Sequence, residues 1–211
     1  YTSWCGPCQT LAKEVFTLDS VADFFNRHFL CVKLDIEKGK GLELKKPFEI
    51  RAYPTLLFLD GKQQVVHRIV GCDGAEYLMK EAGKALDPQL NFRAMQERYM
   101  AGERATDFIL EYLNYLGHAY LEEEANAIAL QYLQGFKEEE LITSANWKII
   151  EKYIKDPLAI PLQVVMKRRK AFFDLAPEQE VINKLNLTCR SALLPFTRWR
   201  PDSEIVFDER Y

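Results

Sequence analysis

The sequence lacks any hydrophobic run long enough to cross a bilayer, which takes about 20 consecutive apolar residues in a helix. It also lacks an excess of charge of either sign, because 28 basic residues stand against 31 acidic residues, for a net charge of -3. No signal peptide is visible where the sequence starts. These absences predict no transmembrane segment and give no electrostatic reason to expect nucleic acid or an anionic membrane as a partner.

Cysteines are few. Five is an odd number and a low density in 211 residues, which argues against a scaffold stapled by disulfides. Cys5 and Cys8 are the one close pair. A CxxC pair can bind zinc when two further ligands lie at suitable spacing. The sequence has no second CxxC and only three scattered histidines, so zinc is the minor alternative and we expect no metal.

The two halves of the sequence differ in their hydrophobic patterning. With 48% hydrophobic residues, the chain can form one large or two small cores. Up to about Leu86, helical patterns alternate with short β-branched runs, which is an α/β pattern. The expected elements are a helix after the cysteine pair, a helix around Val21–Phe25, a strand over Leu30–Ile36, a short helix over Leu42–Lys46, a strand over Thr55–Asp60, a hairpin turn at Asp60-Gly61 into a strand over Gln64–Val70, and a helix over Asp73–Leu86.

Beyond Asp87-Pro88 the patterns are helical throughout. Apolar residues recur every three to four positions, and Gly, Pro, Ser or Asn separates the segments. We therefore predict two domains, an α/β domain over residues 1–87 and an all-α domain over residues 91–211. Short connections between the helices suggest helical hairpins, by analogy with tetratricopeptide repeats, although the full repeat signature is not present.

The cysteine pair has the spacing that thiol exchange requires. A helix is expected directly after Cys5, so Cys5 should lie at its N-terminus, where free backbone N–H groups favour a thiolate. The thiolate is the form that attacks a disulfide, which makes Cys5 the candidate nucleophile. Cys8 lies one turn further along, is expected to be more buried, and is placed to resolve a mixed disulfide. Pro7 suits the first helical turn because its missing N–H costs nothing there.

These residues also carry a family resemblance. Trp4–Cys8 reads WCGPC, which resembles the active-site motif of thioredoxins, and Ala52–Gly71 resembles the family's cis-proline and hairpin segment. The similarity runs from Trp4 to about Leu86. It implies a thioredoxin-like fold in which Cys5 attacks and Cys8 resolves. It further implies a cis Pro54 and a substrate groove whose residues would be Trp4, Gly6, Pro7, Tyr53, Pro54, Thr55, Gly71 and Cys72.

The resemblance also raises an expectation about the sheet. In thioredoxins the strand before WCGPC is central, and here only Tyr1-Thr2-Ser3 could belong to it. The strands over Leu30–Ile36 and Thr55–Asp60 would flank that position without bonding to each other. We therefore expect that upstream residues, or another chain, complete the sheet and supply the buried acid that the family uses as a proton acceptor.

The remaining cysteines are expected to be inert, with one open question. Cys31 in a strand and Cys189 in a helix are most simply core residues. Cys72 would border the groove, where a thiol could be glutathionylated or capture a mixed disulfide. The alternative is a small residue tolerated in a loop.

Three functions remain open. The first is a thiol-disulfide oxidoreductase that reduces or exchanges protein disulfides with electrons from an upstream thiol reductant, and whose helical domain binds a client. Its redox group would be the Cys5–Cys8 disulfide, with no further cofactor. The second is a redox-relay or adaptor module that acts chiefly through its helices, and the third is a structural protein. Similarity to multidomain thioredoxin-like proteins of bacterial envelopes favours a periplasmic location over a cytoplasmic one.

Overall fold

A computed structural model describes residues 1–71 and 73–197, with the side chains of residues 195–197 left out, so Cys72 lies outside the described residues. The chain folds into two compact units, one of residues 1–103 with 115–120 and one of residues 104–114 with 121–211. The division expected near residues 87–91 stays a prediction, because it concerns which segments fold independently.

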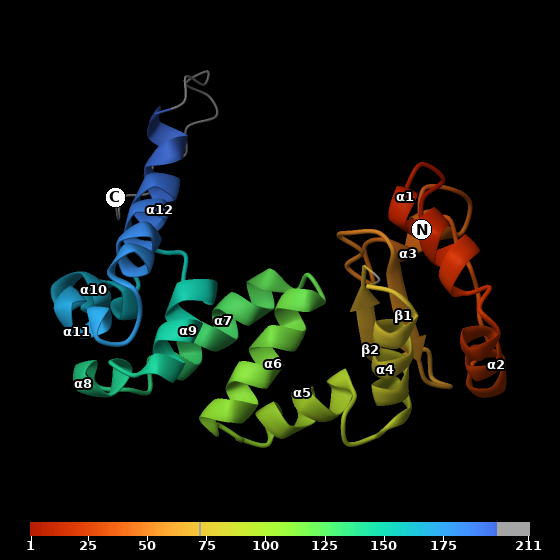
Figure 1. The fold of residues 1–211 in the computed structure, drawn as a ribbon, viewed down its shortest axis with the longest axis horizontal. Helices are drawn as coiled ribbons and strands as arrows, with labels where there is room; N and C mark the ends of the chain where they lie inside the picture. The colour runs from red at the N-terminus through yellow and green to blue at the C-terminus, as the bar shows by residue number, and fades with distance from the viewer. Residues whose placement is uncertain (72, 198–211) are drawn as a thin grey trace. The chain divides into compact units, whose positions relative to one another are not determined.

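The first unit combines one small sheet with several helices (Figure 1). Its elements are α1 (Gly6–Thr10), η1 (Leu11–Val15), α2 (Asp19–His28), α3 (Gly41–Leu44), β1 (Thr55–Leu59), β2 (Val65–Val70), α4 (Ala75–Leu86) and α5 (Phe92–Met100). η1 is a π-helix that continues α1 directly, a widening that the sequence pattern did not indicate. The α/β composition expected of this half is confirmed.

The sheet is an antiparallel hairpin in which Thr55 pairs with Val70 and Phe58 with His67. The turn forms after Asp60, whose carboxylate accepts hydrogen bonds from the N–H groups of Lys62 and Gln64, both at 2.9 Å. Gln63, rather than Gly61, takes the left-handed conformation, with φ 62°. The hairpin is thus confirmed, but a side chain closes the turn that Asp60-Gly61 was expected to form alone.

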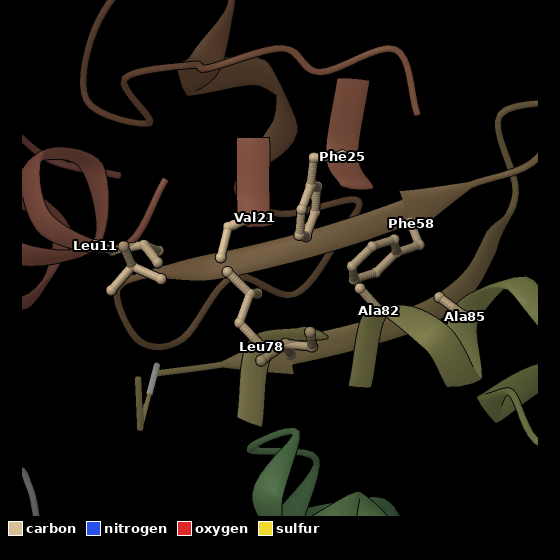
Figure 2. Close-up of a cluster of buried hydrophobic side chains, with 9 residues drawn as sticks. Leu11, Val21, Phe25, Phe58, Leu78, Ala82 and Ala85 are labelled. Carbon is tan, nitrogen blue, oxygen red and sulfur yellow. The ribbon is translucent and has the colours of Figure 1, made fainter. Parts of the chain in front are cut away.

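An apolar core joins η1, α2, both strands and α4. Figure 2 shows side chains of this core from η1, α2, β1 and α4, and β2 contributes Ile69. The buried members are Leu11, Val15, Val21, Phe25, Phe58, Ile69, Leu78, Ala82 and Ala85. This core fixes the helix that carries the cysteines against the hairpin that carries Pro54.

The strand expected over Leu30–Ile36 does not form. The segment 29–35 belongs to no ladder, and the side chains of Leu30 and Val32 are 95% and 72% exposed. The end of this segment pairs with Tyr1, whose backbone nitrogen donates to Leu34 O at 3.1 Å and whose carbonyl oxygen accepts from Ile36 N–H at 2.9 Å. One such pairing is too little for a strand, because a strand is defined by bonds to a neighbour along its length.

Helix α4 begins at Ala75, two residues later than expected. Gly74 before it has φ 92°, a conformation that glycine adopts readily, and no side chain caps the helix. Asp73 and Glu76 have the spacing of a capping box in the sequence, but they do not cap this helix.

Gly41, the first residue of α3, lies so close to the backbone of Asp35 that a side chain does not fit there. A Cβ atom on Gly41 would lie 1.9 Å from Asp35 O and 2.6 Å from Asp35 C. We expect Gly41→Ala to lower the free energy of unfolding by about 1–3 kcal/mol or more, because backbone must move to admit the methyl group. Gly61→Ala is the control, since no atom lies within 4 Å of its added Cβ. Equal denaturant midpoints for the two variants would contradict the prediction.

Helix α5 and residues 115–120 cover the outer edge of β2. The Tyr115 hydroxyl accepts from Arg68 N–H at 2.8 Å and donates to Arg68 O at 3.1 Å. The Phe92 N–H donates to His67 Nδ1 at 3.2 Å, and Arg93 pairs with Asp60 at 2.8 Å. The Tyr115 hydroxyl thus satisfies both backbone groups of Arg68 on an edge strand, which would otherwise be open to another chain.

His67 and Glu81 form a buried polar pair between β2 and α4. Because Phe92 N–H donates to His67 Nδ1, the ring proton lies on Nε2, which faces Glu81 Oε2 at 3.4 Å. Lys84 Nζ lies 2.7 Å from the other carboxylate oxygen. The hydrogen bond from His67, and then Lys84, lower the pKa of Glu81 from 4.5 to about 2.

This pair predicts a loss of stability in acid. The folded pKa of Glu81 is depressed, so its contribution is complete above pH 4.5 and is lost as the pH falls toward about 2. We expect this loss to be roughly 2–3 kcal/mol. Glu81→Gln keeps an acceptor for His67 but cannot ionise, so the difference between wild-type and variant unfolding energies should shrink across this pH interval. A constant difference would contradict the assignment.

The second unit is built from helices throughout its described residues. Its helices are α6 (Thr106–His118, whose last residues belong to the first unit), α7 (Glu122–Leu133), α8 (Glu138–Leu141), α9 (Ser144–Tyr153), α10 (Ile160–Lys167), α11 (Arg169–Phe173) and α12 (Glu178–Thr197). Trp147 and Phe172 are buried in its core, and Trp147 Nε1 donates to Glu180 at 2.7 Å. The all-α character is confirmed. A tetratricopeptide-like repeat stays a prediction.

Candidate functional site

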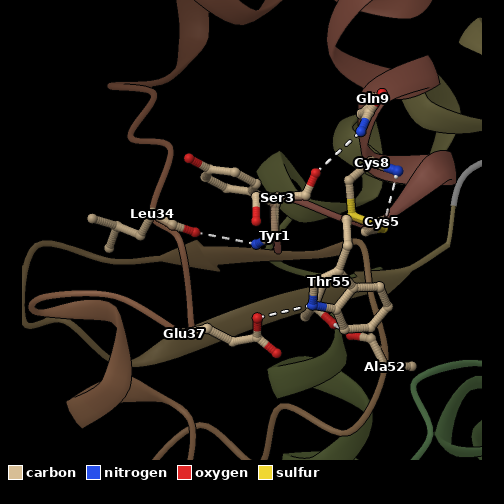
Figure 3. Close-up of a disulfide and its surroundings, with 10 residues drawn as sticks. Tyr1, Ser3, Cys5, Cys8, Gln9, Leu34, Glu37, Ala52 and Thr55 are labelled. Atoms are coloured by element: carbon tan, nitrogen blue, oxygen red, sulfur yellow. Dashed lines mark hydrogen bonds between the residues drawn. A yellow bond between two sulfur atoms is a disulfide. The ribbon is translucent and has the colours of Figure 1, made fainter.

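The two cysteines lie at the start of the first helix, as predicted. Cys5 is the N-cap of α1, and the backbone N–H of Cys8 donates to Cys5 Sγ at 3.1 Å (Figure 3). The pair is joined by a disulfide across a Cα–Cα distance of 5.2 Å. The sulfur of Cys5 therefore occupies the place of an N-capping oxygen, where free N–H groups stabilise negative charge.

The expected difference in burial between the two thiols is not present. Cys5 is 4% exposed and Cys8 is 5% exposed. The disulfide holds the two sulfur atoms together, so both share one environment. What distinguishes them is the hydrogen bond to Cys5 Sγ and not depth, and the assignment of Cys5 as nucleophile depends on that bond.

Trp4 lies beside the disulfide as a largely exposed ring, with 67% of its surface accessible. Its indole Nε1 donates to Glu37 Oε2 at 2.9 Å, and its ring contacts Tyr53 edge to face at 5.9 Å between centroids. Glu37 was missed by sequence reasoning, because it stands 33 residues from Trp4 and no motif marks it. The contacts of Trp4 with Glu37 and Tyr53 hold an apolar surface next to the cysteines.

The proline segment also adopts the predicted conformation. The Tyr53-Pro54 peptide bond is cis. Pro54 O accepts from Gly71 N–H at 2.8 Å, and the Thr55 hydroxyl donates to Ala52 O at 2.7 Å. The structure thus brings Pro54 and Gly71 together at the end of the hairpin, while the Trp4–Tyr53 contact links this segment to the cysteines.

Gly6 and Pro7 form the exposed first turn of α1, between the two cysteines. Cys72 lies outside the described residues, so its expected place beside the groove stays a prediction. The substrate-contact role expected of the other groove residues is likewise a prediction, although Trp4, Tyr53, Pro54 and Gly71 are connected by the contacts above.

A cavity of about 320 Å³ adjoins Cys8. Thr2, Cys8 and Gln9 are among its lining residues. Thr2 is 1% exposed, and its side-chain oxygen is buried without a hydrogen-bond partner. Sequence reasoning missed Thr2, since a threonine in a short stretch before a motif carries no signal of its own.

The lone cysteines divide differently from what was expected. Cys31 is exposed, so its predicted place in the core is wrong; its segment pairs too little to bury either face. Cys189 is partly buried. In the described part of the chain, no group of three or more His, Cys, Asp or Glu residues is arranged to hold a metal ion. No helix among the same residues is long and apolar enough to span a membrane.

Comparison with known proteins locates similarity in the first half of the chain. The family described as thioredoxin matches residues 1–84. A thioredoxin-like protein of Synechocystis sp. is 34% identical over 82 residues, which cover 38% of this chain and 71% of that protein. The matched region contains both the cysteine pair and the cis-proline segment.

Two longer relatives share the same region. A protein disulfide-isomerase of Datisca glomerata is 31% identical over 87 residues, covering 39% of this chain and 17% of that protein. A bifunctional thioredoxin reductase/thioredoxin of Mycobacterium leprae is 30% identical over 91 residues, covering 43% of this chain and 18% of that protein. The chain thus spans less than a fifth of the length of either. No solved structure matches the chain.

Proposed function

Because the chain belongs to the thioredoxin-like family, we propose that it is a thiol-disulfide oxidoreductase that reduces or exchanges protein disulfides through Cys5 and Cys8. The hydrogen bond from Cys8 N–H to Cys5 Sγ, at 3.1 Å, is the observation that carries this proposal. A donor in that position favours a thiolate on Cys5 over a thiol, and the thiolate is the reactive form.

The reaction proceeds in two exchange steps. The Cys5 thiolate attacks one sulfur of a substrate disulfide; a Cys5–substrate bond forms, the substrate S–S bond breaks, and the departing sulfur takes up a proton. The Cys8 thiolate then attacks Cys5 Sγ, the Cys5–Cys8 bond forms, and the second substrate sulfur leaves and is protonated. Two electrons pass from the dithiol to the substrate. An upstream dithiol reductant returns two electrons to the chain.

The groove supplies the contacts for an extended protein substrate. Trp4 and Tyr53 offer an exposed apolar face beside the disulfide, and the backbone around Pro54 and Thr55 lies on the hairpin next to it. Backbone pairing with an extended peptide gives affinity that depends little on side chains, which suits an enzyme acting on many proteins.

The helical unit is the proposed site for a protein client or partner. This unit has a buried core of its own, which includes Trp147 and Phe172. That core supports a role for the unit beyond adding apolar surface to the first unit. The resemblance to multidomain envelope proteins supports a bacterial, periplasmic location, where disulfides persist in proteins.

Insulin reduction by dithiothreitol tests the proposed activity. The complete chain should accelerate the precipitation of insulin B chain at catalytic concentration. A rate equal to that of dithiothreitol alone would contradict the proposal and favour an adaptor role. Wild-type chain whose cysteines have been alkylated is the matched control, since it keeps the protein and removes the thiols.

A further inference from the structure

Thr2 presents a buried hydroxyl that is not satisfied. Among the described residues, its Oγ1 is the one buried side-chain nitrogen or oxygen without a hydrogen-bond partner. The residue is 1% exposed, so solvent does not reach it freely. Buried polar atoms are nearly always paired, and an exception in a native protein calls for an explanation, of which a catalytic role is one.

The hydroxyl belongs to a residue that the active site itself positions. Cys5 N–H donates to Thr2 O at 3.3 Å, which ties Thr2 to the turn that leads into α1. Thr2 and Cys8 both line the cavity of about 320 Å³. The other titratable side chains that line this cavity are Tyr1, Lys13 and Lys33, and Lys33 Nζ lies 4.6 Å from the centre of the Tyr1 ring.

The resolving step requires a negative charge on the Cys8 sulfur, which the disulfide state does not carry. A sulfur in a disulfide is neutral and is a weak acceptor, so a nearby hydroxyl gains little from it. After the disulfide is reduced, Cys8 must become a thiolate to attack Cys5, and burial opposes that charge. A hydroxyl donor beside it would stabilise the charged sulfur and would be satisfied at that stage alone. Donors that act only on the reactive form are those that raise rates.

We propose that the Thr2 hydroxyl donates a hydrogen bond directly to the Cys8 thiolate, and so speeds resolution of the mixed disulfide. This inference rests on the proposed function. In the step concerned, the Cys8 thiolate attacks Cys5 Sγ, the bond from Cys5 to the substrate breaks, and its electron pair leaves on the substrate sulfur, which takes up a proton.

The test uses the complete reduced chain, with Cys31, Cys72 and Cys189 replaced by serine in every variant so that Cys5 and Cys8 are the only thiols, and a chromogenic disulfide, 5,5′-dithiobis(2-nitrobenzoate). Attack by Cys5 releases one coloured thiolate, and resolution by Cys8 releases the second, so stopped-flow absorbance separates the two steps. Thr2→Val removes the hydroxyl and keeps the shape. We expect it to leave the first phase unchanged, to slow the second by about tenfold or more, and to move the pH midpoint of the second upward by about one unit.

Two further variants separate hydrogen bonding from packing. Thr2→Ser keeps the hydroxyl and should restore the second phase. Thr10→Val removes an exposed hydroxyl from α1 and should change neither phase. The oxidised Thr2→Val chain should melt at the same temperature as wild type or higher, because it no longer buries an unpaired hydroxyl. Slower resolution together with undiminished stability is the signature of a functional donor.

The outcomes are distinct. A second phase in Thr2→Val with the wild-type rate and pH profile would overturn the proposal, and an equal loss in Thr2→Val and Thr2→Ser would show that Thr2 acts by packing. A wild-type chain that shows no first phase would overturn the proposed function, and this inference with it.

Discussion

Replacement of Cys5 by serine is expected to reduce insulin reduction to the rate of dithiothreitol alone, the largest effect of any single substitution in this chain. Serine leaves the N-cap geometry intact but offers a hydroxyl that cannot attack a disulfide at neutral pH. Cys8→Ser should also lose turnover, for a different reason. Its Cys5 still attacks, but no second thiol releases the substrate, so mixed disulfides accumulate on Cys5.

Non-reducing electrophoresis and peptide mapping measure these adducts. Cys31→Ser is the matched control, because Cys31 is exposed and outside any disulfide and would otherwise contribute adducts of its own. It should reduce insulin as wild type does. Adducts that accumulate in the Cys5 variant and not in the Cys8 variant would show that the two roles are reversed.

The second large effect is expected at Tyr115, which closes the edge of the hairpin. Tyr115→Phe removes one oxygen, and with it the hydrogen bonds that this oxygen makes to Arg68 N–H and Arg68 O. Each buried backbone group that loses its partner costs about 1–3 kcal/mol, so the loss of two should lower the free energy of unfolding by roughly 2–6 kcal/mol. Chemical denaturation monitored by circular dichroism measures the change.

The aromatic ring itself is kept in that variant. It would retain the stacking that Tyr115 makes with Phe92, at 4.9 Å between ring centroids. Tyr120→Phe is the control, since Tyr120 is 49% exposed and its substitution should change stability by less than about 0.5 kcal/mol. If both variants unfold at the wild-type midpoint, the hydroxyl does not hold the edge strand.

The cysteine site could be predicted from the sequence because it depends on the preferences of neighbouring residues. The order Cys-Gly-Pro-Cys before a helical pattern predicts that Cys5 lies at the helix N-terminus, because proline fits the first turn and few other places in a helix. The apolar run over Thr55–Leu59 and the turn residues after it predict a hairpin for the same local reason. Short-range preferences determine both features, and both are confirmed.

Features that depend on distant partners could not be predicted in this way. The segment over Leu30–Ile36 has the composition of a strand, but a strand needs a neighbour, and composition does not supply one. Glu37 and Thr2 acquire their roles from contacts or a cavity shared with residues that the fold brings near them. The contacts that place α5 within the first unit include the Phe92–His67 and Arg93–Asp60 pairs, which no periodicity indicates.

Differential alkylation of the reduced chain tests the central claim most directly, that the α1 N-terminus makes Cys5 the reactive thiolate. The chain is treated briefly with iodoacetamide at a pH of about 6, two or more units below the ordinary thiol pKa of about 8.5, and the modified sites are mapped by mass spectrometry. Cys5 should be alkylated first, well ahead of Cys8 and of the exposed Cys31. Modification of Cys5 no faster than that of Cys31 would contradict the account.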